Sequence, residues 1–388
     1  MNIAVTGHTY VVAENRMIWR RFTQRYPDSA VTLIVPDRWV TTRYGQRVEY
    51  RVEPEQAGNY AVIALPRLGI VGRSVYRSWD MALRRTAPDV WYVAQDRYAW
   101  STLQAIVYGR LRTPHTKIVG SSTVNIEYTL RRLHHRWKES FFFAATDAIV
   151  AASEKAADLL RVHDYQKPIL VQHSNGPDEE TWKPRGGNEF CARLGLGPFV
   201  VGYVGALIEA KGLLDLTQAL AQLDGEWNAL FVGDGPLRHD LQAFFDSQGL
   251  SARTHFIGYV PHGSVPPYVN CMDVFVLPSR SVEKEGFKEQ FGLVLAEAML
   301  SGVAVVGSDS GAIPEVIGNA GMVFPEGDVS ALAACLQRLH DDPELRCELA
   351  ERGRQRAIQR FSTSALADQF HDFCADLLAG RCTDPGGL

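Results

Sequence analysis

Two carboxylates at a fixed spacing are the side chains of this sequence that are best placed to do chemistry. Glu289 stands just before an apolar run, and Glu297 lies inside that run, eight residues later. The run repeats its apolar residues at helical spacing and meets Gly302 where a helix stop belongs. We expect a helix that opens near Phe291, which puts Glu297 roughly a turn and a half inside it at ~1.5 Å per residue. Glu289 is then left on the loop above the helix.

The start of such a helix is suited to an anion, because its first N–H groups are unpaired and its dipole is positive there. We expect the amides of Phe291, Gly292 and Leu293 to bind this anion. A carboxylate on each side can accept hydrogen bonds from sugar hydroxyls, so the arrangement fits a nucleotide sugar. The plainer alternatives are a helix-start Glu289 stabilised by the dipole and an exposed helical Glu297.

The segment KEQFGLVLAEAMLSGVAVVGSDSGAIPEVIGNAGMVFPEGD (288–328) resembles the signature of family 4 retaining glycosyltransferases, which have the GT-B fold. The motif of that family is Glu, seven residues, Glu. The resemblance is strong over residues 198–330 and extends over the first 180 residues only in layout. It implies that Glu289 contacts hydroxyls of the transferred sugar close to the reacting carbon. It also implies that Glu297 contacts ribose hydroxyls, as acidic residues do in dinucleotide folds.

Lys211 is the cation that we expect to act with Glu289. It follows an apolar strand and the loop that begins at Gly205, and it precedes a predicted helix. A Lys at a helix start opposes the dipole unless an anion lies there, so Lys211 suits a clamp on a diphosphate leaving group. The alternative is a surface Lys on a frayed turn. Members of the family usually carry an Arg directly after the Gly, whereas this chain has Ala206, so leaving-group stabilisation is weaker or another residue supplies the charge.

Further donor-side candidates are turns that follow predicted strands. Gly233 and Asp234 form a turn that borders the nucleotide in the resembling family, although a tight turn alone also explains them. Val260 lies on a segment whose backbone contacts the base in that family. The expected donor-binding residues are therefore Glu297, Phe291, Gly292, Leu293, Gly205, Gly233, Asp234 and Val260.

The first half of the chain offers fewer candidates. Gly7 and His8 follow the first strand, where the resemblance implies a loop that faces donor and acceptor. His8 fits a polar contact or a base, although a lone His near a loop is more often incidental. Many family members place a His after the strand that corresponds to residues 118–120, and this chain has none there. Asn125 matches the second residue of a Gln-Asn pair used by some relatives for the donor sugar, with Glu127 as a further candidate.

Length and composition limit these interpretations. The 388 residues suit two domains, and no apolar run approaches the ~18–20 residues that span a bilayer. The start, MNIAVTG, is typical of a first strand and not of a secretory signal. The six cysteines form no C-x-x-C pair, so we expect neither a zinc site nor a disulfide, in a reduced cytoplasmic setting. Because no Asp-x-Asp occurs, a manganese-dependent type is not supported, and we expect no metal and no cofactor.

Charge is uneven along the chain. Residues 1–184 hold 25 Lys and Arg against 18 Asp and Glu, a net of +7, while the remainder holds 15 against 26, a net of −11. A basic front half suggests an anionic partner, such as a phospholipid surface or a diphosphate-bearing acceptor, although Arg-rich helix faces can simply be solvated. The basic and aromatic runs 131–138 and 16–22 suit peripheral contact with the inner face of an anionic membrane. Nucleic acid binding is disfavoured by the net charge of −4.

The candidate site residues must be positioned by apolar β-rich runs that alternate with helical segments. The runs are buried on both faces, which is typical of parallel sheets in α/β proteins. We expect two doubly wound, Rossmann-like domains with an interdomain cleft, over residues 1–183 and 184–363. The resemblance implies that a last helix, within residues 364–388, crosses back to the first domain.

The predicted function is a retaining, metal-independent transferase that moves a hexose from a UDP or GDP sugar to a polysaccharide, lipid-linked or small-molecule acceptor. One alternative is a GT-B sugar-nucleotide epimerase or a phosphorylase. The other is a non-catalytic sugar-nucleotide binder or partner subunit, which the missing cation at Ala206 and the missing loop His both suggest.

Overall fold

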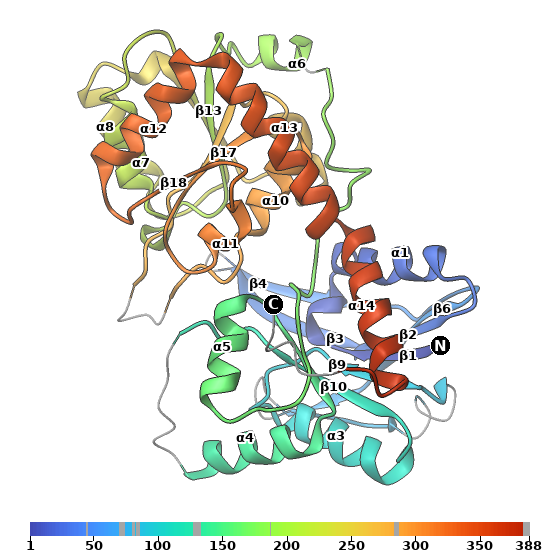
Figure 1. Ribbon diagram of the computed structural model, residues 1–388. Helices are drawn as coiled ribbons and strands as arrows, with labels where there is room; N and C mark the ends of the chain where they lie inside the picture. The colour runs from blue at the N-terminus through green and yellow to red at the C-terminus, as the bar shows by residue number, and fades with distance from the viewer. Residues whose placement is uncertain are drawn as a thin grey trace. The chain divides into compact units, whose positions relative to one another are not determined.

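The computed structural model describes residues 1–43, 46–69, 74–79, 82, 86–126, 133–186, 188–282 and 287–382. The chain divides into two compact units (Figure 1). Unit 1 comprises Met1–Gly176 together with Thr363–Leu388, and unit 2 comprises Pro177–Ser362. The sequence places the divisions at 183/184 and 363/364. Each unit is described by itself below.

Unit 1 is built on an eight-stranded sheet of order β12-β11-β10-β9-β1-β2-β6-β5. Its neighbouring strands pair in parallel, except that the edge strand β5 (Glu55–Ala57) runs antiparallel to β6. The remaining strands are β1 (Asn2–Thr6), β2 (Ala30–Pro36), β6 (Tyr60–Leu65), β9 (Val90–Val93), β10 (Lys117–Ser122), β11 (Ala148–Ala151) and β12 (Ile169–Val171). Strand order reverses between β1 and β9, so the polar loops that follow these strands share one edge.

The helices of unit 1 are α1 (Met17–Arg25), α3 (Trp100–Arg112), α4 (Leu133–Ala145), α5 (Glu154–Val162) and the C-terminal α14 (Thr363–Leu378). The short helices η1 (His8–Val11) and η2 (Glu14–Arg16) precede α1. Helix α14 lies on α1: the ring of Trp19 meets that of Phe370 edge-on at 5.2 Å. The Arg25 guanidinium holds both carboxylate oxygens of Asp368 at 2.6 Å.

The packing of α14 on α1 overturns one expectation. Residues 16–22 were expected to suit a membrane surface, but Trp19 and Phe22 are fully buried and Arg16 is 7% exposed. The Arg16 guanidinium donates to the backbone carbonyls of Tyr10 and Val11 instead of facing lipid. The aromatic side chains of α1 pack against α14, and Arg16 bonds the loop that precedes the helix.

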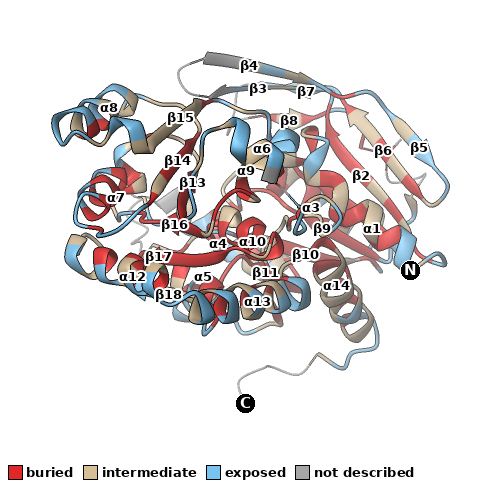
Figure 2. Cartoon of the chain, turned by 90° about the horizontal axis from the view of Figure 1, so that it is seen from above, coloured by how far each residue is buried: buried red, intermediate tan, exposed pale blue. Residues whose placement is uncertain are grey.

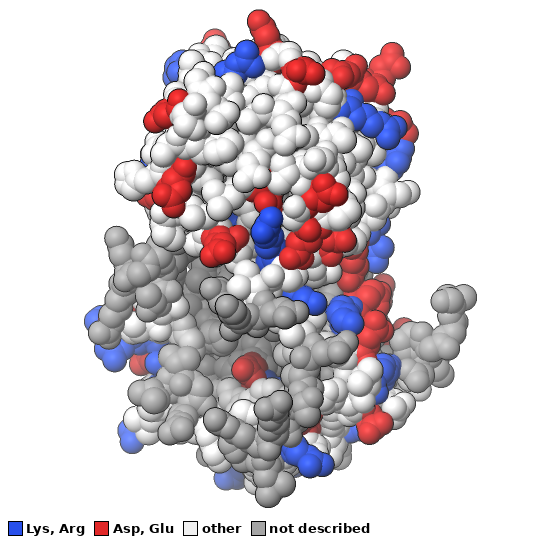
Figure 3. Space-filling view, turned by 90° about the vertical axis from the view of Figure 1, so that its left-hand side faces the viewer, with Lys and Arg blue, Asp and Glu red and all other residues white. Residues whose placement is uncertain are grey.

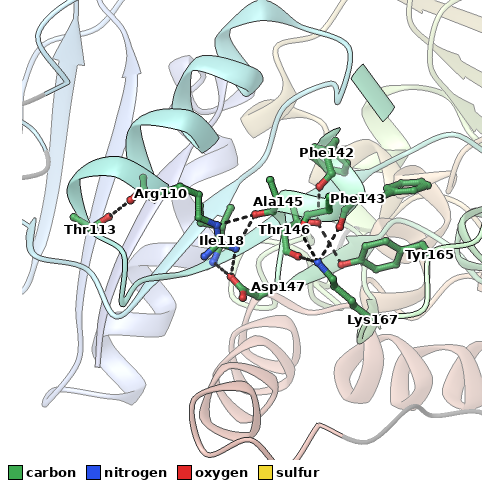
Figure 4. A network of polar contacts seen from close by, with 12 residues as sticks. Arg110, Thr113, Ile118, Phe142, Phe143, Ala145, Thr146, Asp147, Tyr165 and Lys167 are labelled. Carbon is green, nitrogen blue, oxygen red and sulfur yellow. Dashed lines mark hydrogen bonds and ion pairs between the residues drawn. The ribbon is translucent and has the colours of Figure 1, made fainter. Parts of the chain in front are cut away.

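A polar network fixes the far ends of α3 and α4 (Figure 4). Asp147 accepts from the amide of Ile118 and from the guanidinium of Arg110, both at 2.7 Å. The Lys167 ammonium donates to three carbonyls at the end of α4, those of Phe143, Ala144 and Thr146, at 2.7–3.0 Å. Because these carbonyls have no partner within the helix, the ammonium acts as a C-terminal cap.

Two antiparallel pairs in unit 1 were not predicted. Strands β3 (Arg38–Arg43) and β4 (Gln46–Arg51) pair as a hairpin, and β7 (Arg67–Leu68) pairs with β8 (Val75–Tyr76). Trp39 of β3 stacks on His8 at 4.5 Å, and the Arg67 guanidinium lies over the same indole at 4.6 Å. The hairpin is therefore tied to the loop that follows β1.

Unit 2 contains a six-stranded parallel sheet of order β15-β14-β13-β16-β17-β18. Its strands are β13 (Val200–Val204), β14 (Asn228–Val232), β15 (Thr254–Gly258), β16 (Val274–Leu277), β17 (Ala304–Ser308) and β18 (Met322–Phe324). This is the strand order of dinucleotide-binding folds, and it reverses between β13 and β16. Ligands in such sheets bind outside the carboxyl ends of the strands at the reversal.

The helices of unit 2 cover both faces of this sheet. They are α6 (Asn188–Arg193), α7 (Leu213–Leu220), α8 (Arg238–Ser247), α9 (Pro266–Val269), α10 (Leu293–Leu300), α11 (Ile313–Ile317), α12 (Val329–Asp341) and α13 (Pro343–Arg360). Short helices η3 (Glu209–Lys211), η4 (Ser251–Arg253) and η5 (His262–Ser264) follow strands or helix ends. Figure 2 shows α10 and β17 deep in the core, and every residue of α10 from Leu295 to Leu300 is buried.

Cys191 and Cys271 form a disulfide, so the expectation of no disulfide is wrong. The two residues are 80 positions apart, and α6 brings them together: Phe190 packs edge-on against Tyr268 at 5.0 Å. Cysteine spacing gave no signal because the bond joins separate elements of the fold. Within the described ranges, no helix combines the length and the apolar character that crossing a bilayer requires.

Candidate active site

The reversal point of the unit 2 sheet brings together the two residues predicted to act on the donor. Lys211 follows β13 and Glu289 follows β16, the strands between which the order reverses. The Lys211 ammonium lies 2.5 Å from Oε2 of Glu289, and both side chains are mostly buried. The sequence separation of 78 residues is closed by the parallel pairing of β13 with β16.

A third side chain holds Glu289. The buried hydroxyl of Ser279 donates to the same oxygen, Oε2, at 2.8 Å. A carboxylate that is both ion-paired and hydrogen-bonded keeps a defined plane. The aromatic ring of Phe287 lies 5.1 Å from the Lys211 ammonium and adds a cation–π contact. Ser279 was not predicted, because a Ser two residues after a strand gives no signal in one sequence.

Two glycines allow close backbone approach at the loops that carry Lys211 and Glu289. Gly212 has a left-handed φ of 61°, and a Cβ there would lie 1.9 Å from the carbonyl oxygen of Pro278. Gly311 also has a positive φ, and a Cβ there would lie 2.0 Å from the Glu289 carbonyl oxygen, which accepts from the amide of Ala312. Close backbone approach on both sides therefore fixes where Lys211 and Glu289 start.

Helix α10 begins at Leu293, with Gly292 as its N-cap at φ 79°. The predicted opening near Phe291 is two residues early, since Phe291 lies before the cap. The cap residue Gly292 has no side chain to bond the first amides of α10, and the Leu295 amide donates to the Gly292 carbonyl at 2.8 Å. The positive end of the helix is thus close in sequence to Glu289, as predicted, and suits an anion.

Glu297 lies inside α10, with its side chain only 4% exposed. Its Oε1 is 2.7 Å from Nε2 of His262, which opens η5 after β15. The indole of the buried Trp182 packs on the His262 ring, with 5.5 Å between centroids. His262 was missed from sequence because nothing in one chain pairs it with a residue 35 positions later.

The glycine turns predicted to border the donor meet one another. The Gly205 amide bonds the Val232 carbonyl, and a Cβ on Gly233 would lie 1.8 Å from the carbonyl oxygen of Gly205. Gly233 also bonds the Gly258 carbonyl, which links the ends of β14 and β15. These glycines allow three neighbouring strands to end in loops that touch.

Asp234 and Val260 lie at the same edge but do not reach Glu289 by any contact within the described residues. Asp234 accepts from the Gly235 amide at 2.8 Å and lies 3.8 Å from the Arg238 guanidinium. Val260 is partly buried, between the exposed Tyr259 and Pro261. The Arg238 guanidinium also donates to the Phe256 carbonyl, so it belongs to the ends of β14 and β15.

Ala206 leaves the predicted gap in positive charge, and its neighbourhood can be described. Its carbonyl accepts from the Tyr203 hydroxyl at 2.8 Å. The amide of Arg280 bonds the carbonyl of Ala210, so Arg280 starts next to the Lys211 loop. Its guanidinium, however, holds both oxygens of the buried Asp215 at 2.6 Å. Arg280 is therefore committed to a structural pair, and Lys288 and Arg238 are other cations of these loops.

The candidates of unit 1 lie at the carboxyl edge of its own sheet. A Cβ on Gly7 would lie 2.9 Å from the Ala94 carbonyl oxygen, so a glycine is needed there for close approach. Burial lowers the pKa of His8, with Asp96 opposing and Arg67 adding to the effect. Asn125 is buried after β10. Glu127 lies outside the described residues.

A metal site does not emerge from the described ranges: no three His, Cys, Asp or Glu side chains gather there in a way that would hold an ion. Figure 3 shows Asp and Glu side chains over unit 2, in the upper part of the view, with Lys and Arg among them. The cations at the reversal point are thus local features of a unit whose sequence is acidic overall.

Known proteins resemble this chain in sequence and in fold. A family model described as "Glycosyl transferases group 1" matches residues 191–356. The chain is 30% identical over 311 residues to the 2-deoxystreptamine glucosyltransferase of Streptomyces kanamyceticus, covering 72% of this chain and 78% of that protein.

Solved structures share the whole fold. Sucrose-phosphate synthase from Thermosynechococcus elongatus has a TM-score of 0.72 at 20% identity, covering 97% of this chain and 99% of that one. Anabaena HepE in complex with UDP has a TM-score of 0.69 at 18% identity, covering 97% and 100%. These likenesses confirm the predicted fold class: α/β, GT-B, with two Rossmann-like domains.

Proposed function

Because the chain belongs to the glycosyl transferases group 1 family, we propose that it is a retaining, metal-independent transferase that uses a UDP or GDP sugar. The sugar goes to a hydroxyl of a glycan, a lipid-linked molecule or a small molecule. The observation that carries the proposal is the contact of Lys211 with Glu289 at the strand-order reversal, beside an uncapped helix start. The family 4 assignment is part of the same proposal.

The proposed roles follow from the charges and positions of these groups. The Lys211 ammonium has three N–H donors, so it can keep Glu289 and also bind a diphosphate. The amides at the start of α10 bind the same diphosphate. Glu289, held by Lys211 and Ser279, accepts hydrogen bonds from sugar hydroxyls near the reacting carbon. Glu297 accepts them from the ribose.

Retention is then achieved on one face of the sugar. The bond from the anomeric carbon to the diphosphate oxygen breaks, and a bond from the acceptor oxygen to that carbon forms on the same side. The acceptor proton passes to the departing diphosphate, so no enzyme nucleophile is consumed. The protein contributes position and electrostatic stabilisation. Each turnover yields one glycosylated acceptor and one free nucleoside diphosphate.

The test is a screen of UDP and GDP sugars by thermal shift, because a ligand that binds the folded state raises its melting temperature. Hits are then incubated with hydroxyl acceptors in chelator, and the anomeric configuration of the product is read by NMR. We expect a retained configuration and activity in chelator. An inverted product, or activity that requires a metal, contradicts the proposal.

The same assay separates the alternatives. An epimerase or a phosphorylase releases no glycosylated acceptor together with free nucleoside diphosphate. A non-catalytic binder shows a thermal shift without turnover. Slow hydrolysis of the donor that disappears in Lys211→Ala counts against the binder, since binding alone does not need a leaving-group clamp.

We also propose peripheral contact with an anionic membrane through α3 and α4 of unit 1. Trp100, Val107 and Leu111 are exposed along one face of α3, and Trp137 is exposed on α4. Helix α3 ends in the exposed Arg112 and contains no acidic residue, while its Arg110 is held by Asp147 and the Ala145 carbonyl. The Lys138 ammonium of α4 lies 4.4 Å from the Trp100 ring, which links the two helices. Exposed tryptophans with cations are typical of interfacial surfaces.

Sedimentation with vesicles tests this contact. We expect the protein to bind vesicles that contain phosphatidylglycerol and not vesicles of phosphatidylcholine alone, with binding lost in 0.5 M salt. Trp137→Ser should weaken binding several-fold without a change in melting temperature, while Trp39→Ser, a substitution in the hairpin, should not weaken it. Equal binding of wild type and Trp137→Ser contradicts the assignment of the surface.

A further inference from the structure

The carboxylate of Glu297 is buried in an apolar helix. Its neighbours Ala296, Ala298 and Met299 are all fully buried, and its own side chain is 4% exposed. A buried carboxylate is costly unless it is hydrogen-bonded or paired. Among the described residues, His262 is the one side chain that bonds this carboxylate, through Nε2 at 2.7 Å from Oε1.

His262 comes from a different element and remains half exposed. It is the first residue of η5 and follows the loop of Tyr259, Val260 and Pro261, with a side chain 49% exposed. The buried Trp182 packs against the imidazole with 53° between the ring planes. The ring therefore contacts an indole and a carboxylate, while about half of the side chain stays exposed.

A carboxylate that accepts hydrogen bonds from two adjacent hydroxyls must keep a fixed orientation. Its second oxygen must also stay available. One hydrogen bond to Oε1 does this, because it leaves Oε2 and the remaining lone pair of Oε1 unoccupied. Partners behind a binding group commonly orient it in this way. With His262 removed, no other side chain of the described ranges would hold the Glu297 carboxylate toward the loop after β15.

We propose that His262 is a positioning residue for ribose recognition: it holds Glu297 so that the carboxylate accepts hydrogen bonds from the ribose hydroxyls of the nucleotide. This inference rests on the proposed function, in which Glu297 reads the ribose. It assigns to the η5 loop a role in discriminating ribonucleotides from deoxyribonucleotides. It also explains why a half-exposed His bonds an almost wholly buried acid.

Calorimetry with ribo- and deoxyribonucleotides tests this role. The probes are UDP or GDP, whichever the wild type binds, and its 2′-deoxy and 3′-deoxy counterparts. We expect the wild type to bind at least one deoxy form about tenfold more weakly, as expected for one hydrogen bond to a charged group. His262→Ala should weaken ribonucleotide binding about tenfold and leave binding of that deoxy form within twofold. The preference for ribose then disappears.

His262→Gln is the conservative variant, because its amide N–H can reach the position of Nε2 and donate to Glu297. We expect it to keep most of the preference for ribose. His239→Ala, which removes an exposed His of α8 in the same unit, is the matched control and should change neither affinity. Melting temperatures within 2 °C of wild type would show that all variants are folded.

Three outcomes overturn the proposal. His262→Ala with an unchanged ribose preference would show that His262 does not position Glu297. Tighter ribonucleotide binding by His262→Ala would show that His262 competes with the ribose. Equal weakening of ribo and deoxy forms would show a structural role. A wild type that binds neither UDP nor GDP refutes the proposed function itself, whereas the three outcomes above leave that function intact.

Discussion

Lys211 and Glu289 form a mostly buried ion pair, with 2.5 Å between the ammonium nitrogen and Oε2, across the two strands where the order of the unit 2 sheet reverses. The pair explains how a basic and an acidic group lie together in the proposed site for a diphosphate and a sugar. Each group neutralises the other while the site is empty. The Lys211 ammonium has three N–H donors and can also bind a diphosphate.

Lys211→Met should lower kcat/KM about 100-fold, because one stabilising group on a developing anion is worth ~10²–10³ in rate. The measurement is steady-state release of nucleoside diphosphate. Lys183→Met, which removes an exposed cation of unit 2, is the control and should retain full activity. The double variant Lys211→Met/Glu289→Gln separates loss of the clamp from the effect of an orphaned carboxylate. Wild-type kcat/KM in Lys211→Met would rule out the leaving-group role.

Glu289→Gln and Glu297→Ala should affect different kinetic parameters. We expect Glu289→Gln to lower kcat more than it changes donor affinity, because its contacts lie near the reacting carbon. Glu297→Ala should instead weaken nucleotide binding about tenfold or more, through loss of hydrogen bonds to a charged group. Calorimetry and steady-state kinetics measure the two effects. Unchanged UDP and GDP affinity in Glu297→Ala would refute its ribose role.

Lys167→Met should destabilise unit 1, because it removes the cap on three carbonyls at the end of α4. We expect a loss of about 1–2 kcal/mol in the free energy of unfolding, as for other charged groups that satisfy helix ends. Urea denaturation measures it. Lys167→Arg should recover part of the loss, and an unaltered midpoint in Lys167→Met would show that the cap contributes nothing.

Stability should fall as the pH drops below about 6.5, the ordinary pKa of His. Burial lowers the pKa of His173 and of His8, so the folded chain holds these rings neutral where the unfolded chain takes up protons. Below pH 6.5 the unfolded state therefore binds more protons, and the free energy of unfolding decreases until the lowered folded pKa is passed. Melting temperatures of wild type and His173→Gln between pH 8 and 5 measure the slope. We expect a shallower slope in the variant, and a parallel curve would contradict the assignment to His173.

Much of the fold could be predicted because its strands are continuous apolar runs. The apolar runs at 60–65, 90–93, 148–151 and 274–277 form β6, β9, β11 and β16, and the long helical segment 343–360 forms α13. The β3–β4 hairpin was missed because its strands are rich in Arg and Thr and resemble a solvated segment. Trp39 and Tyr50 of the hairpin pack against the core, and the partners of Trp39, His8 and Arg67, lie far away in sequence.

The candidate site divides in the same way. Lys211, Glu289 and Glu297 were predicted because charged residues at strand and helix ends stand out in a sequence. Ser279 and His262 were not, because their importance depends on contacts made across separate loops. The disulfide was missed for the same reason. Long-range pairing of individually ordinary residues is what a single sequence does not display.

The return of α14 to unit 1 has a consequence for how the chain acquires its structure during synthesis. Unit 2 is one continuous stretch and can complete its core as soon as residue 362 has left the ribosome. Unit 1 cannot complete its core so early, because the indole of Trp19 packs against Phe370, which is made about 350 residues later. The first-made half of the protein is thus finished only after α14 has been made, and its apolar core stays incomplete until then.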